Sequence, residues 1–252
     1  MKNLRQITKN ILQSVEEVSG KGIQMMRDES LTVLASLTIA RDGVPFHILR
    51  YKPSNDPLDY FIAHQAGFVL RLYDCLPSQR FDFSGNEAGV QTISNLLSVA
   101  SGSFKGDEEE IQTYSQMLSQ WALMNLRSLP IGMRIDEWIS KSFPDLHDLH
   151  QQGIAIQQQQ NINLLSMKMG KYHIPSSLMG PVSAYALFGD RLSKSDSFST
   201  PFTAAGLRDQ GVELLKIWDA ISHDPSADCQ LVDAWAATSQ LSNWYEWNPH
   251  KS

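Results

Sequence analysis

The stretch Asp59-Tyr-Phe-Ile-Ala-His64-Gln65-Ala-Gly-Phe68-Val-Leu-Arg71 decides how the fold of this chain is interpreted. Apolar residues occur on most sides of the helix that this stretch would form. The pattern therefore predicts a helix over residues 57–75 that is buried on most of its surface. The imidazole of His64 lies within it, where a polar ring is either a hydrogen-bonded core group or part of a functional site.

The residues before this helix predict another helix and a small sheet. Leucines, isoleucines and valines spaced by three and four over residues 3–18 indicate an amphipathic helix that ends near Gly20 or Gly22. Two runs rich in β-forming residues, 31–40 and 44–51, are joined at Asp42-Gly43, which predicts a β-hairpin. Pro45 favours an edge position for the second strand, because proline donates no ladder hydrogen bond.

Everything after Pro77 has a helical pattern, with a linker-like stretch over residues 193–201. The predicted helices cover residues 88–101, 108–128, 134–150, 153–169, 177–193, 203–222 and 228–240. We therefore predict an α+β fold, mostly α, in which a small N-terminal antiparallel sheet packs on the buried helix and a helical array follows. Residues 1–105 would form the α+β portion and residues 106–252 the helical portion, either as two units or as one continuous domain.

Composition excludes several classes of function. A formal charge of -6 and a pI near 5.6 argue against nucleic-acid binding, which depends mostly on Lys and Arg. No apolar run approaches the roughly 18 residues that span a bilayer, so no membrane partner is expected. Two distant cysteines, Cys75 and Cys229, fit the reducing cytoplasm. The chain has no glycine-rich phosphate loop and no Cys-x-x-Cys pair, so no cofactor is predicted.

The segment His64-Gln65-Ala66-Gly67-Phe68 has the spacing of a zinc-peptidase His-Glu-x-x-His motif. With an N-terminal helix and a short sheet before it, the arrangement over about residues 1–100 resembles the compact zincin domains of the ImmA/IrrE-like metallopeptidases. The resemblance implies that His64 is in the first ligand position, Gln65 in the general-base position and Phe68 in the second ligand position.

The departures from the motif matter more than the match. Gln65 has no carboxylate to accept a proton, and Phe68 cannot bind a metal. The degenerate motif therefore predicts no catalytic residue and no metal in the usual zincin arrangement. We expect a catalytically inactive, zincin-like protein that acts through protein–protein interaction. The resemblance implies a regulatory or structural subunit of a bacterial or mobile-element assembly.

The alternative is a metal-dependent hydrolase with a non-standard ligand set. His147 and His150 are three residues apart on a predicted helix, so both rings can lie on one side of it. His64 and a carboxylate would complete the set. The neighbouring acids Asp136 and Glu137 form a poor catalytic pair because adjacent helix residues point in different directions; we expect them near a helix N-terminus, where the dipole favours acids.

The remaining candidates are binding residues. Arg71 lies two turns after His64 and could hold a substrate carboxylate or phosphate, although an ion pair with Asp74 or Asp82 is the simpler expectation. Trp244, Tyr245 and Trp247 concentrate aromatic surface near the C-terminus, where it could bind a protein partner or a second copy of the chain. The same three residues could instead fix the terminal segment to the core.

Overall fold

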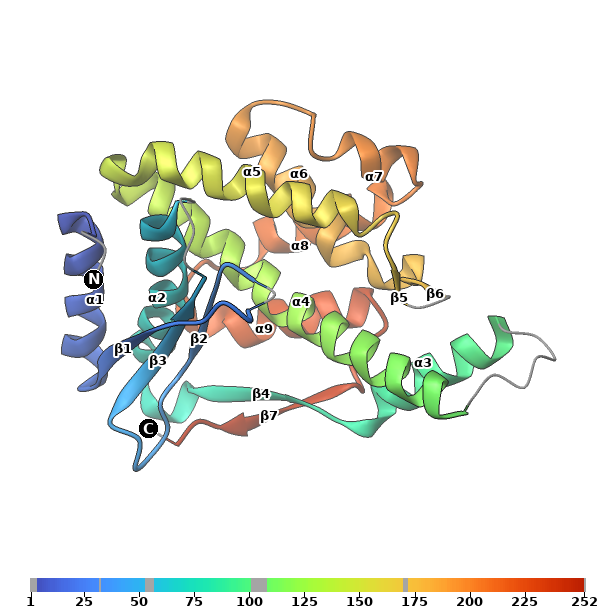
Figure 1. Cartoon of the computed structure of the whole chain (residues 1–252), viewed down its shortest axis with the longest axis horizontal. Coiled ribbons are helices and arrows are strands. Elements are labelled where there is room, and N and C mark those ends of the chain that lie inside the picture. The colour runs from blue at the N-terminus through green and yellow to red at the C-terminus, as the bar shows by residue number, and fades with distance from the viewer. Residues whose placement is uncertain (1–3, 32, 53–56, 101–107, 170–171, 252) are drawn as a thin grey trace.

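The predicted buried helix is present as α2 (Leu58–Asp74), which lies between the N-terminal sheet and the helical remainder of the molecule (Figure 1). The computed structural model describes residues 4–31, 33–52, 57–100, 108–169 and 172–251. The fold is α+β and mostly α, as predicted.

The N-terminal sheet has three strands, β1 (Gly22–Arg27), β2 (Ala35–Thr38) and β3 (Phe46–Tyr51), in the order β1-β3-β2. The predicted hairpin is confirmed, because β2 and β3 pair antiparallel. The prediction of a purely antiparallel sheet is wrong, because β1 pairs parallel to β3 and makes it the central strand. The edge position expected for this strand from Pro45 is therefore wrong: the proline is tolerated because pairing begins at Phe46, so it occupies no place in the ladder.

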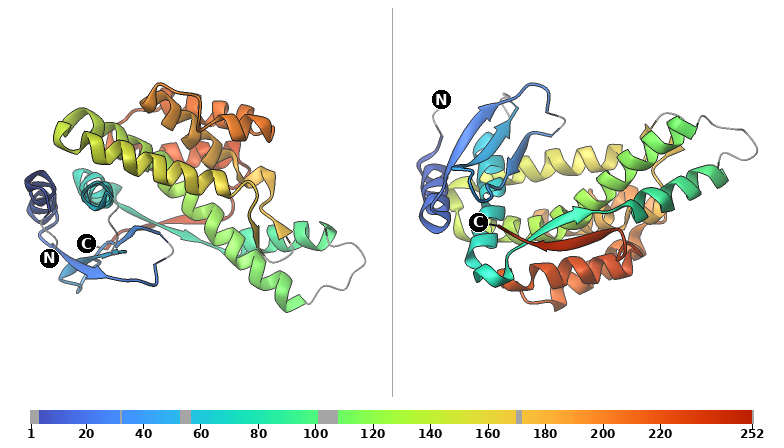
Figure 2. Two further views of the ribbon diagram at one scale, coloured as in Figure 1. Left: turned by 45° about the horizontal axis from the view of Figure 1, so that its top comes forward. Right: turned by 90° about the horizontal axis from the view of Figure 1, so that it is seen from below.

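Helix α1 (Gln6–Ser19) ends where the sequence predicts, at Gly20, whose φ of 68° suits a residue without a Cβ. It lies beside α2, and the two helices pack on one face of the sheet (Figure 2). The alternation along β3 follows from this arrangement. His47 and Leu49 are buried against the helices, whereas Phe46 and Arg50 point to solvent.

The helical remainder begins with α3 (Glu87–Ala100), which packs on the N-terminal part of α4 (Glu108–Ser142). The later helices are α5 (His147–Asn163), α6 (Gly180–Ser193), α7 (Thr200–Ala204), α8 (Arg208–Ala220) and α9 (Asp228–Thr238). Two-residue strands β5 (Lys168–Met169) and β6 (Tyr172–His173) connect α5 to α6, and 3₁₀ turns occupy Pro77–Gln79, Pro144–Leu146, Ser176–Leu178 and Pro225–Ala227.

Helix α4 differs most from expectation, because one helix of 35 residues replaces the predicted pair 108–128 and 134–150. It runs through Pro130, although a proline removes one backbone donor from the helix. The helix stops at Ser142, because the residue before Pro144 is pushed out of the α region. Phe143 accordingly has φ −128° and ψ 75°.

A second sheet was not predicted. Strand β4 (Phe81–Gly85) pairs antiparallel with β7 (Tyr245–Pro249), which joins the middle of the chain to its C-terminal end. The two strands run side by side along the lower edge of the molecule (Figure 1). Each strand is short and lies more than 150 residues from its partner, so local pattern could not reveal the pairing.

One main core cluster extends through the described residues from Ile11 to Tyr245. A smaller cluster of Leu49, Leu58 and Ile62 lies between the sheet and α2. The predicted boundary between residues 105 and 106 falls outside the described residues. None of the helices described here combines the length and apolarity needed to cross a membrane.

Candidate functional site

The buried carboxylate of Asp136 is the centre of the polar cluster around His64. It lies on α4 and is fully buried. The Tyr60 hydroxyl of α2 donates to its Oδ1 at 2.7 Å. The Tyr185 hydroxyl of α6 lies 3.3 Å from its Oδ2 and 3.1 Å from Gln157 Oε1, so its single proton serves one acceptor at a time. The prediction that Asp136 sits near a helix N-terminus is wrong, because α4 continues through this position.

Two imidazoles flank the same carboxylate oxygen. The Nε2 atom of His64 lies 3.8 Å from Asp136 Oδ1, and that of His150 lies 3.4 Å from it. The His64 ring also lies against Gly132 of α4, and the ring of Phe68 meets it edge-on at 5.5 Å between centroids. His64 is therefore enclosed by α2 and α4.

The described structure brings together only part of the alternative ligand set. His64 and His150 share the Asp136 cluster, but His147 is exposed and its Nε2 lies 3.0 Å from Gln151 Nε2 of the same helix. Within the described ranges, no three His, Cys, Asp or Glu side chains are placed to hold a metal ion. Phe68, in the position of the second ligand, packs on His64 and supplies no donor. These residues do not fit the zinc of a zincin.

The electrostatics of the cluster favour neutral groups beside one carboxylate. Burial raises the pKa of both Tyr60 and Tyr185, and the nearby Asp136 charge acts in the same direction. Burial also lowers the pKa of His64, against the opposing effect of Asp136. Tyrosines that keep their protons act as hydrogen-bond donors, so the arrangement stabilises a buried carboxylate.

Glycines allow the helices that build the cluster to approach closely. A Cβ on Gly153 of α5 would lie 2.1 Å from the Tyr60 ring, and one on Gly67 of α2 would lie 2.5 Å from Ile135. Gly132 faces His64 in the same way at 3.2 Å. Gly67 of the His64–Phe68 segment therefore has a packing role at the crossing of α2 and α4.

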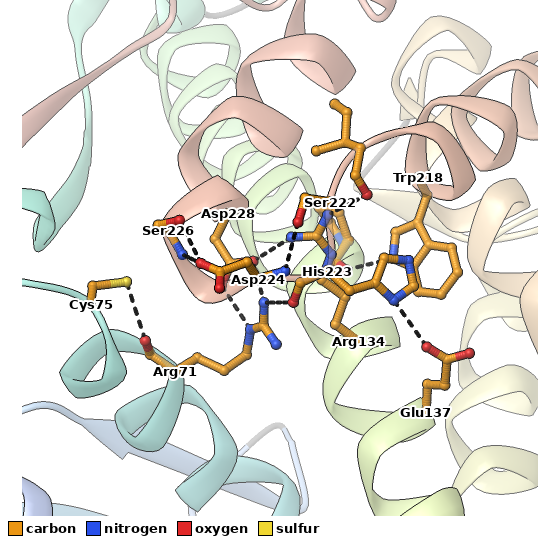
Figure 3. Close-up of polar contacts among 12 residues, drawn as sticks. Arg71, Cys75, Arg134, Glu137, Trp218, Ser222, His223, Asp224, Ser226 and Asp228 are labelled. Carbon is orange, nitrogen blue, oxygen red and sulfur yellow. Dashed lines mark hydrogen bonds and ion pairs between the residues drawn. The ribbon is translucent and has the colours of Figure 1, made fainter.

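Arg71 is part of a second polar cluster, shown in Figure 3, and its predicted partners Asp74 and Asp82 are wrong. Its Nε and Nη2 atoms donate to the two carboxylate oxygens of Asp228 at 2.8 and 2.7 Å. Arg134 of α4 donates to the same carboxylate at 2.7 Å. Asp228 begins α9, so this carboxylate joins three helices that are distant in sequence.

The C-terminal aromatic residues are mostly engaged within the chain. Trp244 and Tyr245 are buried, and Trp247 is partly buried. The Tyr245 hydroxyl and the Trp247 Nε1 both donate to Asp233 Oδ1, at 2.6 and 2.8 Å. Phe83 of β4 stacks on Tyr245 with 4.5 Å between centroids. These residues fix β7 to β4 and α9, which leaves little of them for a partner.

The sequence identified His64 and His150 as candidates, but Asp136 was expected near a helix N-terminus and the tyrosines that bind it were missed. Asp136, Tyr60 and Tyr185 come from separate helices, and no spacing rule relates them. The available signal was that Asp136 follows Ile135 directly, within three to four residues of Ile139 and Gly132, positions that a helix can bury on one side; a buried acid needs several donors.

No protein-family model matches this chain, and neither a curated protein nor a solved structure matches it.

Proposed function

We propose that this protein is a non-catalytic, zincin-like protein that acts in the cytoplasm by binding another protein or a second copy of itself. The observation that carries the proposal is the enclosed state of His64. Where the resemblance would place a catalytic metal, the ring lies between Phe68, Tyr60 and the Gly132 backbone. Gln65, in the base position, has no carboxylate.

The outer face of the N-terminal sheet is the surface that best supports an interaction. Phe46 and Met26 are 48% and 44% exposed there, and Ile48 lies between them on the same face. Polar Gln24 and Arg50 adjoin these apolar side chains. Exposed apolar groups with a polar surround are typical of protein-binding surfaces. With the scaffold resemblance, this surface supports a regulatory or structural subunit of a bacterial or mobile-element assembly.

The alternative of a metal-dependent hydrolase using His64, His147 and His150 has weaker support. His64 and His150 do flank Asp136, but the exposed position of His147 removes the third proposed ligand. A catalytic zinc site normally uses three protein ligands.

Association measurements on paired variants test the proposal. The wild type should show concentration-dependent self-association in analytical ultracentrifugation, or co-purify with a defined partner from its native host. Met26→Ser combined with Phe46→Ser should abolish that association. Leu96→Ser is the matched control, because Leu96 is 47% exposed on α3, away from the sheet. Association that survives in the double variant would show that the outer face of the sheet is not the binding surface. If the wild type neither self-associates nor co-purifies with a partner, the proposal itself is contradicted.

Elemental analysis of protein purified without a His tag or added metal separates the two functions. About one equivalent of zinc, manganese or iron per chain, lost in His64→Ala, would favour the hydrolase.

A further inference from the structure

A small hollow between β4 and α4 contains an arginine without a counter-ion. The hollow has a volume of about 290 Å³ and is lined by Phe83 and Gly85 from β4 and by Gln120, Leu123, Met124, Arg127 and Ser128 from α4. Arg127 is partly buried. Among the residues that the structure describes, it has no hydrogen-bond or ion-pair partner, in contrast to the paired Arg71 and Arg134.

The acid whose charge acts on Arg127, Asp82, makes no ion pair with it among the described residues. Asp82 attracts it only at longer range, and the Asp82 carboxylate already binds Arg41 Nε at 2.9 Å and His250 Nδ1 at 2.9 Å. Burial lowers the pKa of Arg127. A guanidinium keeps its charge at neutral pH, so the hollow holds one positive charge in a partly desolvated place. Such a charge is unfavourable unless an anion joins it.

The walls of the hollow define the rest of the ligand. Phe83, Leu123 and Met124 are apolar, and Gln120 adds an amide to the rim. The backbone of β4 already approaches α4 closely at Gly85, because a Cβ built on this glycine would lie 2.6 Å from Leu123. The hollow suits a small molecule rather than an added strand.

We propose that this hollow binds a small carboxylic acid, with its carboxylate on the guanidinium of Arg127 and its apolar body against Phe83, Leu123 and Met124. A single arginine matches one carboxylate through two parallel hydrogen bonds. A phosphate ester carries about two charges and favours additional cations, whereas Arg127 is the single cation among the lining residues that the structure describes. The inference is independent of the proposed protein–protein function.

Calorimetric titration with phenylacetate and hexanoate, each paired with its neutral amide, tests the site on the full chain. Both acids should bind saturably at one site. The affinity for phenylacetamide and hexanamide should be lower by about tenfold or more, because a charge-assisted hydrogen bond is lost. Arg127→Gln should weaken acid binding by about the same factor. Arg208→Gln, at an exposed arginine of α8, should leave it unchanged.

The thermal midpoint of Arg127→Gln and a second variant show whether a loss of binding results merely from unfolding. Arg127→Gln should keep or raise the thermal midpoint, since it removes an unpaired, partly buried charge. Gln120→Glu, two helical turns before Arg127, should also weaken binding because it supplies an internal carboxylate. Absence of saturable acid binding, equal affinity for acid and amide, or full affinity in folded Arg127→Gln protein would each overturn the proposal.

Discussion

At the scale of single residues, the core around His64 holds several buried polar groups: Asp136 accepts from Tyr60, whereas His150 Nε2 has no hydrogen-bond partner among the described residues. His64 was recognisable as an unusual residue in an apolar helix, and its burial is confirmed. Its neighbour Asp136 was not recognisable, because this carboxylate reaches His64 only through the packing of α4 against α2, and Tyr185 of α6 in turn contacts Asp136. The hydropathy pattern of a sequence identifies a buried polar residue more readily than it identifies the group that hydrogen-bonds to it.

Tyr60→Phe should destabilise the protein by about 1–3 kcal/mol, because Asp136 loses its shortest donor and Gln157 loses an acceptor. Denaturant unfolding of the variant against wild type measures the change. Tyr51→Phe is the control, since no hydrogen bond of the Tyr51 hydroxyl occurs within the described ranges. Equal effects of the two substitutions would show that the Tyr60 hydroxyl has no special role.

His47 should make the free energy of unfolding decrease at acid pH. Burial lowers its pKa from 6.5 to about 4, with smaller contributions from Lys21 and His250. Its Nδ1 accepts from the Ala40 N–H at 3.0 Å, which also requires the neutral ring. As the pH falls, the His47 imidazole takes up a proton in the unfolded chain before it does so in the folded one. Its contribution to the free energy of unfolding is therefore complete above about pH 6.5 and falls as the pH drops toward 4, by at most about 3 kcal/mol.

The thermal midpoint of His47→Asn measured between pH 7 and pH 4 checks this expectation. Asparagine retains an acceptor near the Ala40 N–H, so the variant should be less stable at neutral pH but less sensitive to acid. His147→Asn, on the exposed side of α5, should keep the wild-type slope. An unchanged slope in His47→Asn would contradict the assignment.

At the scale of elements, the sequence predicted individual segments better than their ends and contacts. The N-terminal helix, the hairpin and α2 were all located from periodicity and turn residues. The join of two predicted helices into α4 was missed, because Pro130 is normally a helix breaker. Here the Pro130 carbonyl accepts from Trp218 Nε1 at 3.0 Å, a contact that depends on α8.

Gly153→Ala should disrupt the crossing of α5 over α2. The new methyl would lie 2.1 Å from the Tyr60 ring, and overpacking of this kind costs about 1–3 kcal/mol. This loss of stability should exceed the stabilisation of about 1 kcal/mol that alanine gains over glycine in helix propensity. Gln152→Ala on the exposed side of the same helix is the control. Chemical unfolding compares them, and a stabilised Gly153→Ala would show that α5 shifts freely.

At the scale of the whole molecule, the decisive contacts join distant parts of the chain. The β4–β7 pairing and the Asp228 cluster connect α2, α4 and the C-terminal residues. Neither was predictable, since charge and strand propensity at one site do not identify a partner more than 90 residues away. Both connect residues on the two sides of the expected division between residues 105 and 106, and α2 and α9 share one core cluster.

Asp228→Ala should therefore weaken the whole molecule rather than α9 alone. Removing the carboxylate leaves Arg71 and the nearly inaccessible Arg134 without their anion, and breaking a buried ion pair in this way costs about 3–5 kcal/mol. Asp219→Ala is the matched control, because it breaks the exposed pair with Arg191 at 2.7 Å and should cost about 0–1 kcal/mol. Hydrogen exchange locates the effect: protection should fall in α2 and α4 as well as α9, whereas loss confined to α9 would mean that Asp228 only anchors its own helix.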